Sequence, residues 1–470
     1  MPEAPTIDTG NTAWLLVSSA LVLLMTPGLA LFYGGLNRSK GVLNMMMMSF
    51  SSIGLISILW LFYGFSVAFG DDVNGVWGNL GQYLGTKTFL AETDLWGETG
   101  IPLYVFMAFQ MMFAIITVAL ISGSISDRAK FSGWLLFAFG WATLVYFPVA
   151  HMVWGGGFIG ADIGALDFAG GTAVHINAGA AALALALVLG KRVGWPREGM
   201  KPHNVPMVAL GTGLLWFGWF GFNAGSELTV DAITGIAFLN TQVCTAAAIL
   251  GWIVVEWLRN GKPTLVGASS GAVAGLVAIT PACAFVAPWA AVLLGLVAGA
   301  VCALAVGLKY RLGFDDSLDV VGVHFVGGWI GCLWIGLFGT SQISSLVANE
   351  GLFYGGGLAQ LGAQALSALI VSVLSFVIAY ALGFAIEKTI GFRVTQEAEV
   401  DGIDIAEHAE SGYDLSPAGG GGGGGAFALA GIGTPSSKPT ASVEEAEPVE
   451  EVEPAAPVEP AEPVSEKVAG

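Results

Sequence analysis

The chain alternates between long apolar runs and short polar loops over most of its length. A helix needs roughly 20 mainly apolar residues to span a bilayer. Eleven runs are long enough, and we expect one transmembrane helix in each. They cover residues 12–35, 42–69, 102–125, 132–153, 170–190, 203–224, 232–258, 264–283, 289–308, 320–340 and 359–386. The pattern therefore predicts an all-α polytopic membrane protein with eleven transmembrane helices.

Lys and Arg gather in every second loop between these runs. They follow the odd-numbered spans, at Arg38, Lys40, Arg128, Lys130, Lys191, Arg192, Arg197, Lys201, Arg259, Lys262, Arg311, Lys309, Lys388 and Arg393. The loops on the other side hold only Lys87. Because loops rich in Lys and Arg stay on the cytoplasmic side, we expect the N-terminus outside and the C-terminus in the cytoplasm. The residues before Arg38 carry acids and no basic residue, so we expect no cleaved signal peptide.

An odd number of spans in each half has a topological consequence. Spans one to five and six to ten must enter the membrane from opposite sides, which predicts an inverted five-helix repeat with a site near the midplane. Span five and span ten both begin with Leu-Asp, at Asp167 and Asp319, and each then carries a histidine, His175 or His324. We expect these two helices to be antiparallel, and each acid to cap its own helix.

Composition changes sharply after Arg393. We expect a transmembrane domain over residues 1–394, an ordered cytoplasmic regulatory segment over 395–417, and a disordered region over 418–470 that contains a glycine linker and an acidic Pro/Glu tail. The formal net charge of −18 comes largely from this tail and from short loops, such as the acidic outer loop 71–101 that includes Glu92. The charge therefore suggests no nucleic-acid partner.

The four cysteines lie in apolar runs without the spacing of metal ligands. They are Cys244, Cys283, Cys302 and Cys332. We interpret them as small core residues, and we predict neither a metal nor a cofactor.

An ionisable residue inside a membrane span is costly, so each buried histidine is a functional hypothesis. For His175 or His324 alone, a core residue that bonds a neighbouring helix is an equally good interpretation. Their matching positions in two halves favour function. Burial and a neighbouring imidazole favour the neutral ring, and a neutral pair can share one proton, relay protons and line a path for a small amine. A haem or metal role lacks further ligands.

Aromatic residues gather toward the outer ends of spans three, four and six. A single aromatic residue at an interface is common, but these rings together can attract a cation, with about 2 kcal/mol or more from a desolvated contact. A nearby hydroxyl can accept a hydrogen bond from an N–H donor, and the acid Asp167 adds attraction through its field. The residues are Phe109, Phe113, Trp154, Trp219, Phe222 and the hydroxyl residue Ser226.

Several runs closely resemble the bacterial ammonium transporter (Amt) family of the ammonium transporter/methylammonium permease/Rhesus superfamily. The resemblance covers residues 12–415. The runs are Asp167-Phe-Ala-Gly-Gly-Thr, His175-Ile-Asn, Ala150-His-Met-Val-Trp-Gly-Gly-Gly, Lys201-Pro-His-Asn, Gly218-Trp-Phe-Gly-Phe-Asn-Ala-Gly-Ser226, Thr280-Pro-Ala-Cys and Val323-His324.

The resemblance implies a homotrimer in the cell membrane with one pore per subunit. It implies ammonium or ammonia as substrate, with methylammonium as a further candidate, and a cytoplasmic PII signalling protein as partner. For the outer ammonium site, it implies Trp154, Phe113 and Ser226, with Phe109 nearby, and for the gate it implies Phe113 and Phe222. For the pore, it implies His175 and His324 as the histidine pair and proton relay, and Trp219 as a lining residue. Asp167 would be a structural acid.

The chain departs from the family pattern at three places. Met111 and Met112 stand where relatives often carry small residues, and Ala409 stands in the C-terminal segment where glycine is usual. The acidic tail has no counterpart in the family pattern. Regulation is therefore a weaker expectation than transport.

A bare ammonium ion in an apolar pore would be costly, but ammonium can lose a proton and potassium cannot. We therefore predict recruitment of NH4+ outside, deprotonation near the Phe gate, and passage of NH3 past the histidines. The sequence leaves electrogenic transport and a gas channel both open.

Three other classes of function are alternatives. A sensor would signal through the C-terminal tail. An enzyme would need a nucleophile, acid or metal set that the chain lacks, so we predict none. A sodium-coupled transporter would need helices broken at mid-membrane, whereas Pro148, Pro206 and Pro281 lie near span ends.

Overall fold

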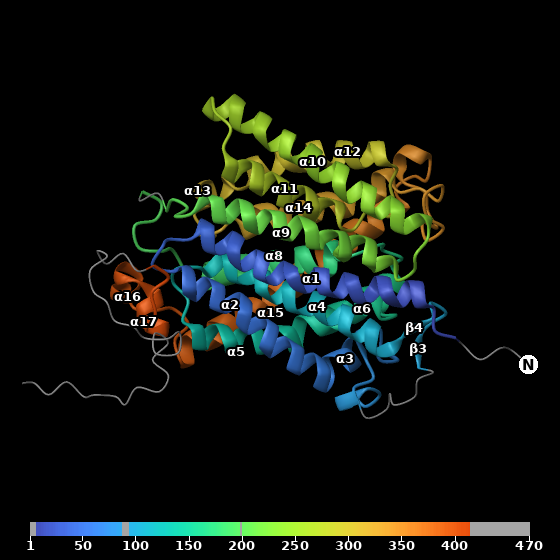
Figure 1. Ribbon diagram of the computed structural model, residues 1–470, viewed down its shortest axis with the longest axis horizontal. Helices are drawn as coiled ribbons and strands as arrows, with labels where there is room; N and C mark the ends of the chain where they lie inside the picture. The colour runs from blue at the N-terminus through green and yellow to red at the C-terminus, as the bar shows by residue number, and fades with distance from the viewer. Residues whose placement is uncertain (1–5, 87–93, 198–199, 414–470) are drawn as a thin grey trace, which may run out of the picture. The chain divides into compact units, whose positions relative to one another are not determined.

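The computed structural model describes residues 6–86, 94–197 and 200–413, and helices dominate this part of the chain (Figure 1). The α-helices are α1 Thr9–Leu36, α2 Val42–Leu59, α3 Phe65–Phe69, α4 Leu103–Ile121, α5 Phe131–Trp141, α6 Phe147–Trp154, α7 Phe158–Ala161, α8 Asn177–Leu189, α9 Val205–Ala224, α10 Ala232–Asn260, α11 Leu265–Ile279, α12 Pro288–Ala305, α13 Leu308–Leu312, α14 Val326–Phe338, α15 Ala359–Thr389, α16 Gln396–Asp401 and α17 Ile403–His408.

Several α-helices are joined without a break by turns of another helix type. The π-helical turns are η1 Trp60–Gly64, η4 Ala142–Tyr146, η5 Gly171–Ile176 and η7 Val321–Phe325, and the 3-10 turns are η2 Leu84–Thr86, η3 Ser122–Ile125, η6 Gly225–Glu227 and η8 Leu352–Tyr354. The outer loop 71–101 contains two short antiparallel pairs, in which β1 Asp72–Val73 pairs with β2 Trp77–Gly78 and β3 Leu95–Trp96 pairs with β4 Ile101–Pro102.

Ten of the eleven predicted spans lie on helices that are long and apolar enough to cross a membrane, counted over the described ranges. The run 264–283 is the exception. Its helix α11 has 15 residues and ends at Ile279, and a buried turn follows from Thr280. The prediction of a helix through residue 283 was therefore wrong, because Pro281 has no N–H to continue the helical ladder.

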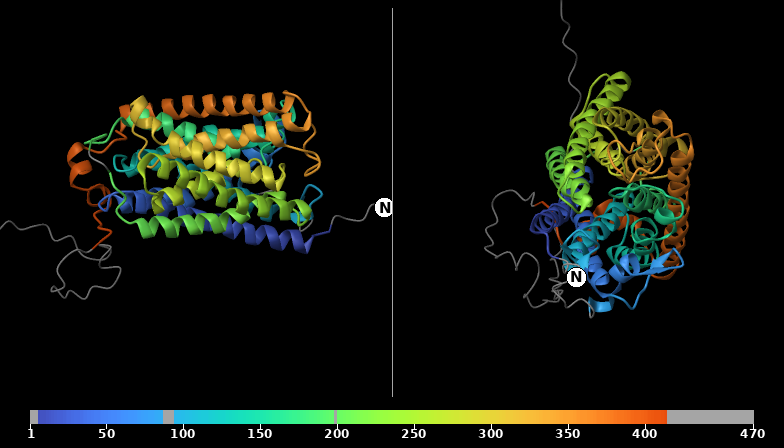
Figure 2. Two further views of the ribbon diagram at one scale, coloured as in Figure 1. Left: turned by 90° about the horizontal axis from the view of Figure 1, so that it is seen from above. Right: turned by 90° about the vertical axis from the view of Figure 1, so that its right-hand side faces the viewer.

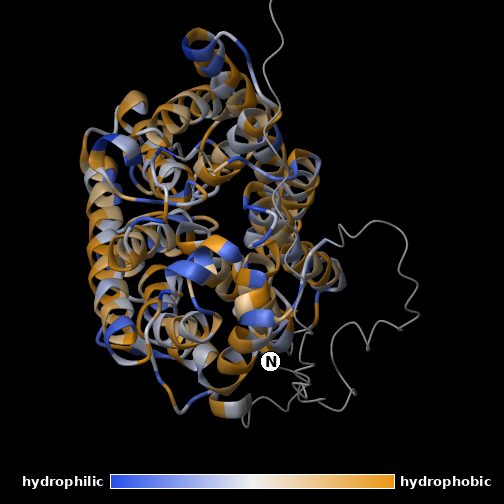
Figure 3. Ribbon diagram, turned by 90° about the vertical axis from the view of Figure 1, so that its left-hand side faces the viewer, coloured by the Kyte–Doolittle hydropathy of each residue, from blue (hydrophilic) through white to orange (hydrophobic). Residues whose placement is uncertain are grey.

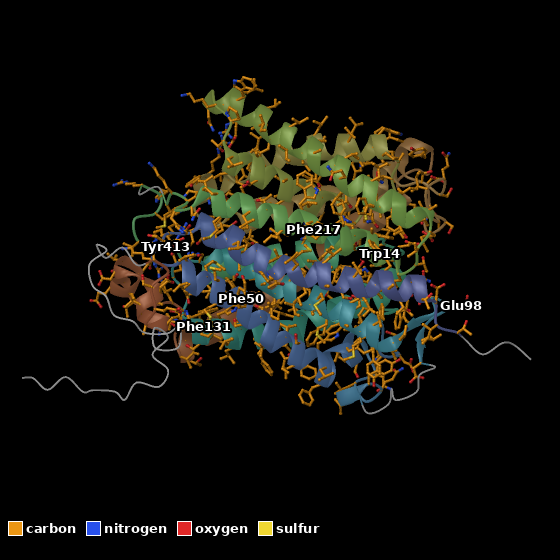
Figure 4. The ribbon with its side chains drawn as sticks, in the orientation of Figure 1. Trp14, Phe50, Glu98, Phe131, Phe217 and Tyr413 are labelled. Atoms are coloured by element: carbon orange, nitrogen blue, oxygen red, sulfur yellow. The ribbon has the colours of Figure 1, made fainter. Side chains whose placement is uncertain are left out.

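The long helices pack side by side with similar axis directions (Figure 2). Small residues permit this close packing, as is typical of helices in membranes. A Cβ added to Gly211 of α9 would lie 2.3 Å from the Phe32 backbone nitrogen of α1, and one added to Gly299 of α12 would lie 2.1 Å from the Ala248 carbonyl oxygen of α10. The outer faces of the helices are apolar, and large side chains such as Phe50 and Phe217 are exposed there (Figure 4). A contiguous exposed apolar surface of this kind suits a lipid environment.

The chain that follows α15 folds back against the ends of earlier helices. Arg393 pairs with Glu399 of α16 at 2.7 Å. Asp404 of α17 accepts hydrogen bonds from the first amides of α2, at Leu43 and Asn44, and Glu407 accepts one from Phe131 at the start of α5. Hydrophilic segments, including α16 and α17, gather at this end of the helices (Figure 3). The expected linker and tail, together with Lys87 and Glu92, lie outside the described residues.

The four cysteines are free and buried in the core. Within the described ranges, no group of three or more His, Cys, Asp or Glu side chains is placed to hold a metal ion.

Candidate functional site

An outer cavity of about 170 Å³ lies at one end of α4, α6 and α9. Three residues predicted to bind the cation, Phe113, Trp154 and Ser226, line it together. The rings of Phe113 and Trp154 are nearly perpendicular, with centroids 6.1 Å apart. Ser226 donates its hydroxyl proton to the Phe222 carbonyl at 2.8 Å, so its oxygen lone pairs can still accept. The full lining is Phe69, Trp96, Phe106, Gln110, Phe113, Trp154, Phe168, Ser226 and Leu228.

Phe109 lies behind this cavity rather than in its lining. Its ring is buried, with its centroid 4.9 Å from that of Phe113. A Cβ added to Gly225 would lie 3.1 Å from the Phe109 ring. Phe109 therefore packs against Phe113, one of the residues that line the outer cavity.

Phe113 and Phe222 separate the outer cavity from an inner one. Their rings are stacked, with centroids 4.2 Å apart, and both side chains are buried. Phe113 lines the outer cavity, whereas Phe222 lines a narrow inner cavity of about 10 Å³. The inner lining is Met25, Leu29, Ile116, Leu120, Val174, His175, Leu215, Trp219, Phe222, Val273 and His324. The stacked pair therefore lies between the linings of the two cavities.

The two histidines meet in the inner cavity. The Nδ1 atoms of His175 and His324 lie 3.3 Å apart, and both side chains are almost completely buried. Two nitrogens at this distance require one to donate and the other to accept, so a neutral pair holds one proton between them. The Nε2 atom of His175 has no hydrogen-bond partner.

Trp219 stacks on the His175 ring, with centroids 5.5 Å apart and planes 18° apart. Its indole N–H donates to the Thr280 hydroxyl at 2.8 Å. The polar edge of Trp219 is therefore satisfied, and its ring presents an apolar wall to the cavity.

Both histidines lie in π-helical turns, His175 in η5 and His324 in η7. Such turns are rare and are frequent at functional sites. The helices that carry them run in opposite directions, because Arg192, just after α8, bonds Asp315, just before η7. The antiparallel arrangement agrees with the sequence prediction.

Asp167 binds the start of η5 and does not line either cavity. Its two carboxylate oxygens accept hydrogen bonds from four successive amides, those of Gly170, Gly171, Thr172 and Ala173, at 2.6–3.1 Å. It also accepts the Thr172 hydroxyl proton. The acid therefore neutralises the unpaired donors at the start of the helix that carries His175.

The expectation that Asp319 caps the second helix was wrong. The Val321 amide at the start of η7 donates to Asp316 at 2.8 Å, whereas Asp319 pairs with Lys309 at 2.7 Å. Asp319 has a φ of 63°, in the left-handed region. Burial raises the pKa of Asp316 to about 6, although the Lys309 charge lowers it.

A spacing in the sequence would have identified the correct acid. Asp167 precedes His175 by eight residues, and Asp316 precedes His324 by eight, whereas Asp319 precedes it by five. The shared Leu-Asp dipeptide drew attention to the wrong position.

Sequence reasoning also missed two lining residues of the outer cavity and the partners of a buried histidine on α6. Trp96 comes from β3 and Gln110 from α4, and both line the outer cavity. His151 is buried on α6, with its Nε2 2.9 Å from Asp72 Oδ1 and its Nδ1 3.1 Å from the Ala68 carbonyl oxygen. The motif that contains His151 was noticed, but nothing in the sequence named its partners.

Comparison with known proteins gives a consistent result. A family model described as the Ammonium Transporter Family matches residues 13–413. An ammonium transporter of Mycobacterium tuberculosis is 56% identical over 438 residues, which cover 88% of this chain and 92% of that protein. The ammonium transporter Amt1 of Archaeoglobus fulgidus is 41% identical over 407 residues, which cover 87% of this chain and all of that protein.

Solved structures agree with this match. The crystal structure of Saccharomyces cerevisiae Mep2 is 34% identical with a TM-score of 0.78, over 88% of this chain and 93% of that chain. A structure titled Sensor Amt Protein is 29% identical with a TM-score of 0.77, over 85% of this chain and 98% of that chain.

Proposed function

This chain belongs to the Ammonium Transporter Family, and from that premise we propose that it moves ammonium nitrogen across the cell membrane through the two cavities described above. It is a multi-pass membrane protein. The proposed path begins in the outer cavity, crosses the Phe113–Phe222 pair and continues past His175 and His324. One observation carries the proposal. The outer cavity, with the predicted cation-binding residues, and the inner cavity, with the two histidines, lie on opposite sides of the same stacked pair of rings.

The proposed topology has eleven spans in two inverted five-helix halves, with the N-terminus outside and the C-terminus in the cytoplasm. The equal spacing of Asp167 and Asp316 from their histidines supports two related halves. The antiparallel orientation of α8 and α14 supports their inversion. The positive-inside distribution of Lys and Arg supports the orientation.

The outer cavity recruits the cation. The rings of Phe113 and Trp154 attract positive charge, and the Ser226 oxygen accepts an N–H hydrogen bond. The recruited cation is NH4+, and methylammonium is a further candidate because it keeps N–H donors. Asp167 supports this site through the helix that it caps and through its carbonyl, which holds the Trp154 indole at 2.8 Å.

Deprotonation at the stacked rings allows passage. The cavity beyond Phe222 is mainly apolar and buried, so it favours NH3 over NH4+. Potassium has no proton to lose, so it cannot cross in neutral form. His175 and His324 then offer the only titratable groups among the lining residues of the inner cavity.

The proton has two possible routes. If the histidine pair relays it inward by exchanging the proton shared at 3.3 Å, transport is electrogenic. If the proton returns outside, the protein is a gas channel. The unpartnered Nε2 atom of His175 favours the relay, because a relay needs a free nitrogen that faces the cavity.

We also propose a homotrimer that binds a PII-type signalling protein on its cytoplasmic face. The docking of α17 on the starts of α2 and α5 supports a regulatory role for the C-terminal segment 395–417, because those contacts give an effector something to displace. The Gly-rich and acidic region 418–470 has no assigned role.

The test is current recording on proteoliposomes that receive an ammonium pulse. The parent, His175→Ala with His324→Ala, and the control His203→Ala are compared; His203 bonds Asn37 and Tyr413 and lines neither cavity. We expect current in the parent and the control, and loss of current in the double variant. NH3 flux without current in the parent would support the gas channel.

A second candidate function is an ammonium sensor that signals through the C-terminal segment. One solved structure that resembles this chain is titled Sensor Amt Protein. Ammonium binding in the parent without current and without NH3 flux would favour this alternative.

A further inference from the structure

The outer cavity extends beyond the residues needed to bind ammonium. Phe69, Trp96 and Phe106 form a second group of rings on its wall, next to Phe113 and Trp154. Trp96 and Phe106 are stacked with centroids 3.8 Å apart. Phe69 meets both rings edge to face, at 5.7 Å from Trp96 and 5.0 Å from Phe106. With Phe168, six aromatic side chains line one cavity of about 170 Å³.

The polar lining of the cavity is sparse and uncharged. It consists of the Ser226 hydroxyl and the Gln110 side-chain amide, and no Asp, Glu, Lys or Arg is among the lining residues. Gln110 makes no side-chain hydrogen bond within the described part of the chain, so it can turn toward or away from a guest. The loop that supplies Trp96 also carries Asp71, Asp72 and Glu98, and their field attracts cations to the mouth.

A wall of aromatic rings around an uncharged interior is the arrangement that recognises alkylated ammonium ions. Such ions spread their charge over methyl groups that pack against ring faces, and they need no hydrogen-bond acceptor. We infer that the outer cavity is an aromatic cage for small quaternary ammonium ions, with tetramethylammonium as the simplest member, and that such an ion occupies it without being transported. The inference rests on the proposed function only for the claim of competition with ammonium.

Two features prevent a quaternary ion from passing further. It has no N–H bond, so it cannot lose a proton and become neutral. The next barrier is the Phe113–Phe222 stack, whose rings are 4.2 Å apart, and the inner cavity beyond it is mainly apolar. A fixed positive charge there would be costly. The bound ion therefore blocks the entrance.

The first experiment measures binding without any transport. The full-length purified chain is titrated calorimetrically with tetramethylammonium chloride, and with potassium chloride at the same ionic strength. The variants are Trp96→Leu and the control Trp77→Leu. Trp77 lies in the same outer loop, is 48% exposed and does not line the cavity. We expect saturable binding of tetramethylammonium only, weakened roughly tenfold by Trp96→Leu and unchanged by Trp77→Leu.

The second experiment measures competition in proteoliposomes. Outside tetramethylammonium should raise the ammonium concentration that gives half-maximal current, leave the maximal current unchanged, and carry no current itself. Trp96→Leu should need more tetramethylammonium than the parent to reach the same degree of inhibition. This increase should be larger, as a fold-change, than the increase in the half-maximal ammonium concentration of the same variant.

The two proposals fail in different ways. Saturable, Trp96-dependent binding in a protein without ammonium transport would support the cage and overturn the proposed function. Ammonium transport with no tetramethylammonium binding, or with binding that Trp96→Leu leaves unchanged, would overturn the cage and leave the proposed function intact. A tetramethylammonium current would also overturn the inference.

Discussion

The Trp154 indole N–H donates to the Asp167 backbone carbonyl at 2.8 Å. The same residue, Asp167, uses its carboxylate to bind the first amides of the helix that carries His175. One acid therefore links a wall of the outer cavity to the backbone that positions a lining residue of the inner cavity.

Replacing Asp167 by Ala should destabilise the protein and weaken ammonium binding together. The variant leaves four backbone amides without their acceptor. Loss of one cap costs about 1 kcal/mol, and up to about 2 kcal/mol, so we expect about 3 kcal/mol here. The measurements are the thermal midpoint in detergent and the half-maximal ammonium concentration. Asp162→Ala removes an exposed acid nearby and should change neither value; an unchanged midpoint in Asp167→Ala would contradict the capping role.

Replacing Trp154 by Leu should raise the half-maximal ammonium concentration roughly tenfold, because an aliphatic side chain removes the π face that attracts the cation. The maximal rate should change less. Trp289→Leu is the matched control, since Trp289 is exposed and lines neither cavity. Unchanged ammonium affinity in Trp154→Leu would mean that the cation is held by Ser226 and the other rings instead.

The helices could be predicted from sequence because each span must be long and apolar enough to cross the bilayer. A run of about 20 apolar residues with polar ends can form little else, and most boundaries agree within a few residues, as in 203–224 against Val205–Ala224. The end of α11 was missed because residues 280–286 are as apolar as a helix. Their turn is stabilised by burial against distant residues, such as Phe168, whose amide bonds the Pro281 carbonyl.

Residues of the candidate site could be predicted where their type is unusual in an apolar run. They could not be predicted where only the folded backbone brings them to the site. His175 and His324 were conspicuous as ionisable residues in apolar runs, and the structure brings them together. The π-helical turns that carry them could not be recognised from the hydrophobic spacing. One wide turn shifts the apolar pattern by only a single residue, which is too little to detect in a span that is apolar on all sides. Trp96 looked like an ordinary loop residue, since only the folded outer loop brings it to the cavity.

Asp316 should make stability depend on pH, and Asp316→Asn should remove that dependence. Burial raises the pKa of Asp316 from 3.8 to about 6, so the folded protein binds this proton more tightly than the unfolded chain does. The contribution to stability is therefore full below about pH 4 and is lost as pH rises to 6. Two pKa units correspond to about 3 kcal/mol.

The measurement is the difference in thermal midpoint between Asp316→Asn and the parent at pH 4.5 and pH 7.5. Asparagine stays neutral and can still accept from the Val321 amide, so the variant should gain relative to the parent as pH rises. Asp162→Asn, which alters an exposed acid, should follow the parent at both values. A variant that loses stability relative to the parent at pH 7.5 would show that the charged carboxylate is needed there.

Breaking the ion pair between Arg192 and Asp315 should be the most damaging of these changes. Arg192 donates to both carboxylate oxygens through Nε and Nη2, each at 2.9 Å, and Asp315 is completely buried. Burial by itself would raise the pKa of Asp315, but the hydrogen bond and charge of Arg192, with the charge of Arg128, hold it below the usual value. Stability from this acid is therefore present above about pH 4 and is lost as pH falls through the lowered pKa.

Asp315→Ala removes the closest partner of a buried guanidinium and leaves it only Asp127, at 3.8 Å, so we expect a loss of about 3 kcal/mol, at the lower end for a broken buried pair. Because the pair joins the end of α8 to the start of η7, we also expect the His175–His324 contact to loosen and ammonium current to fall. Thermal midpoint and current are measured together, with Glu350→Ala as control because that acid bonds Ser341 in an exposed loop. The double variant Arg192→Leu with Asp315→Leu should recover part of the lost stability, since it removes both charges. Equal stability of the single and double variants would show that the pair acts through packing rather than charge.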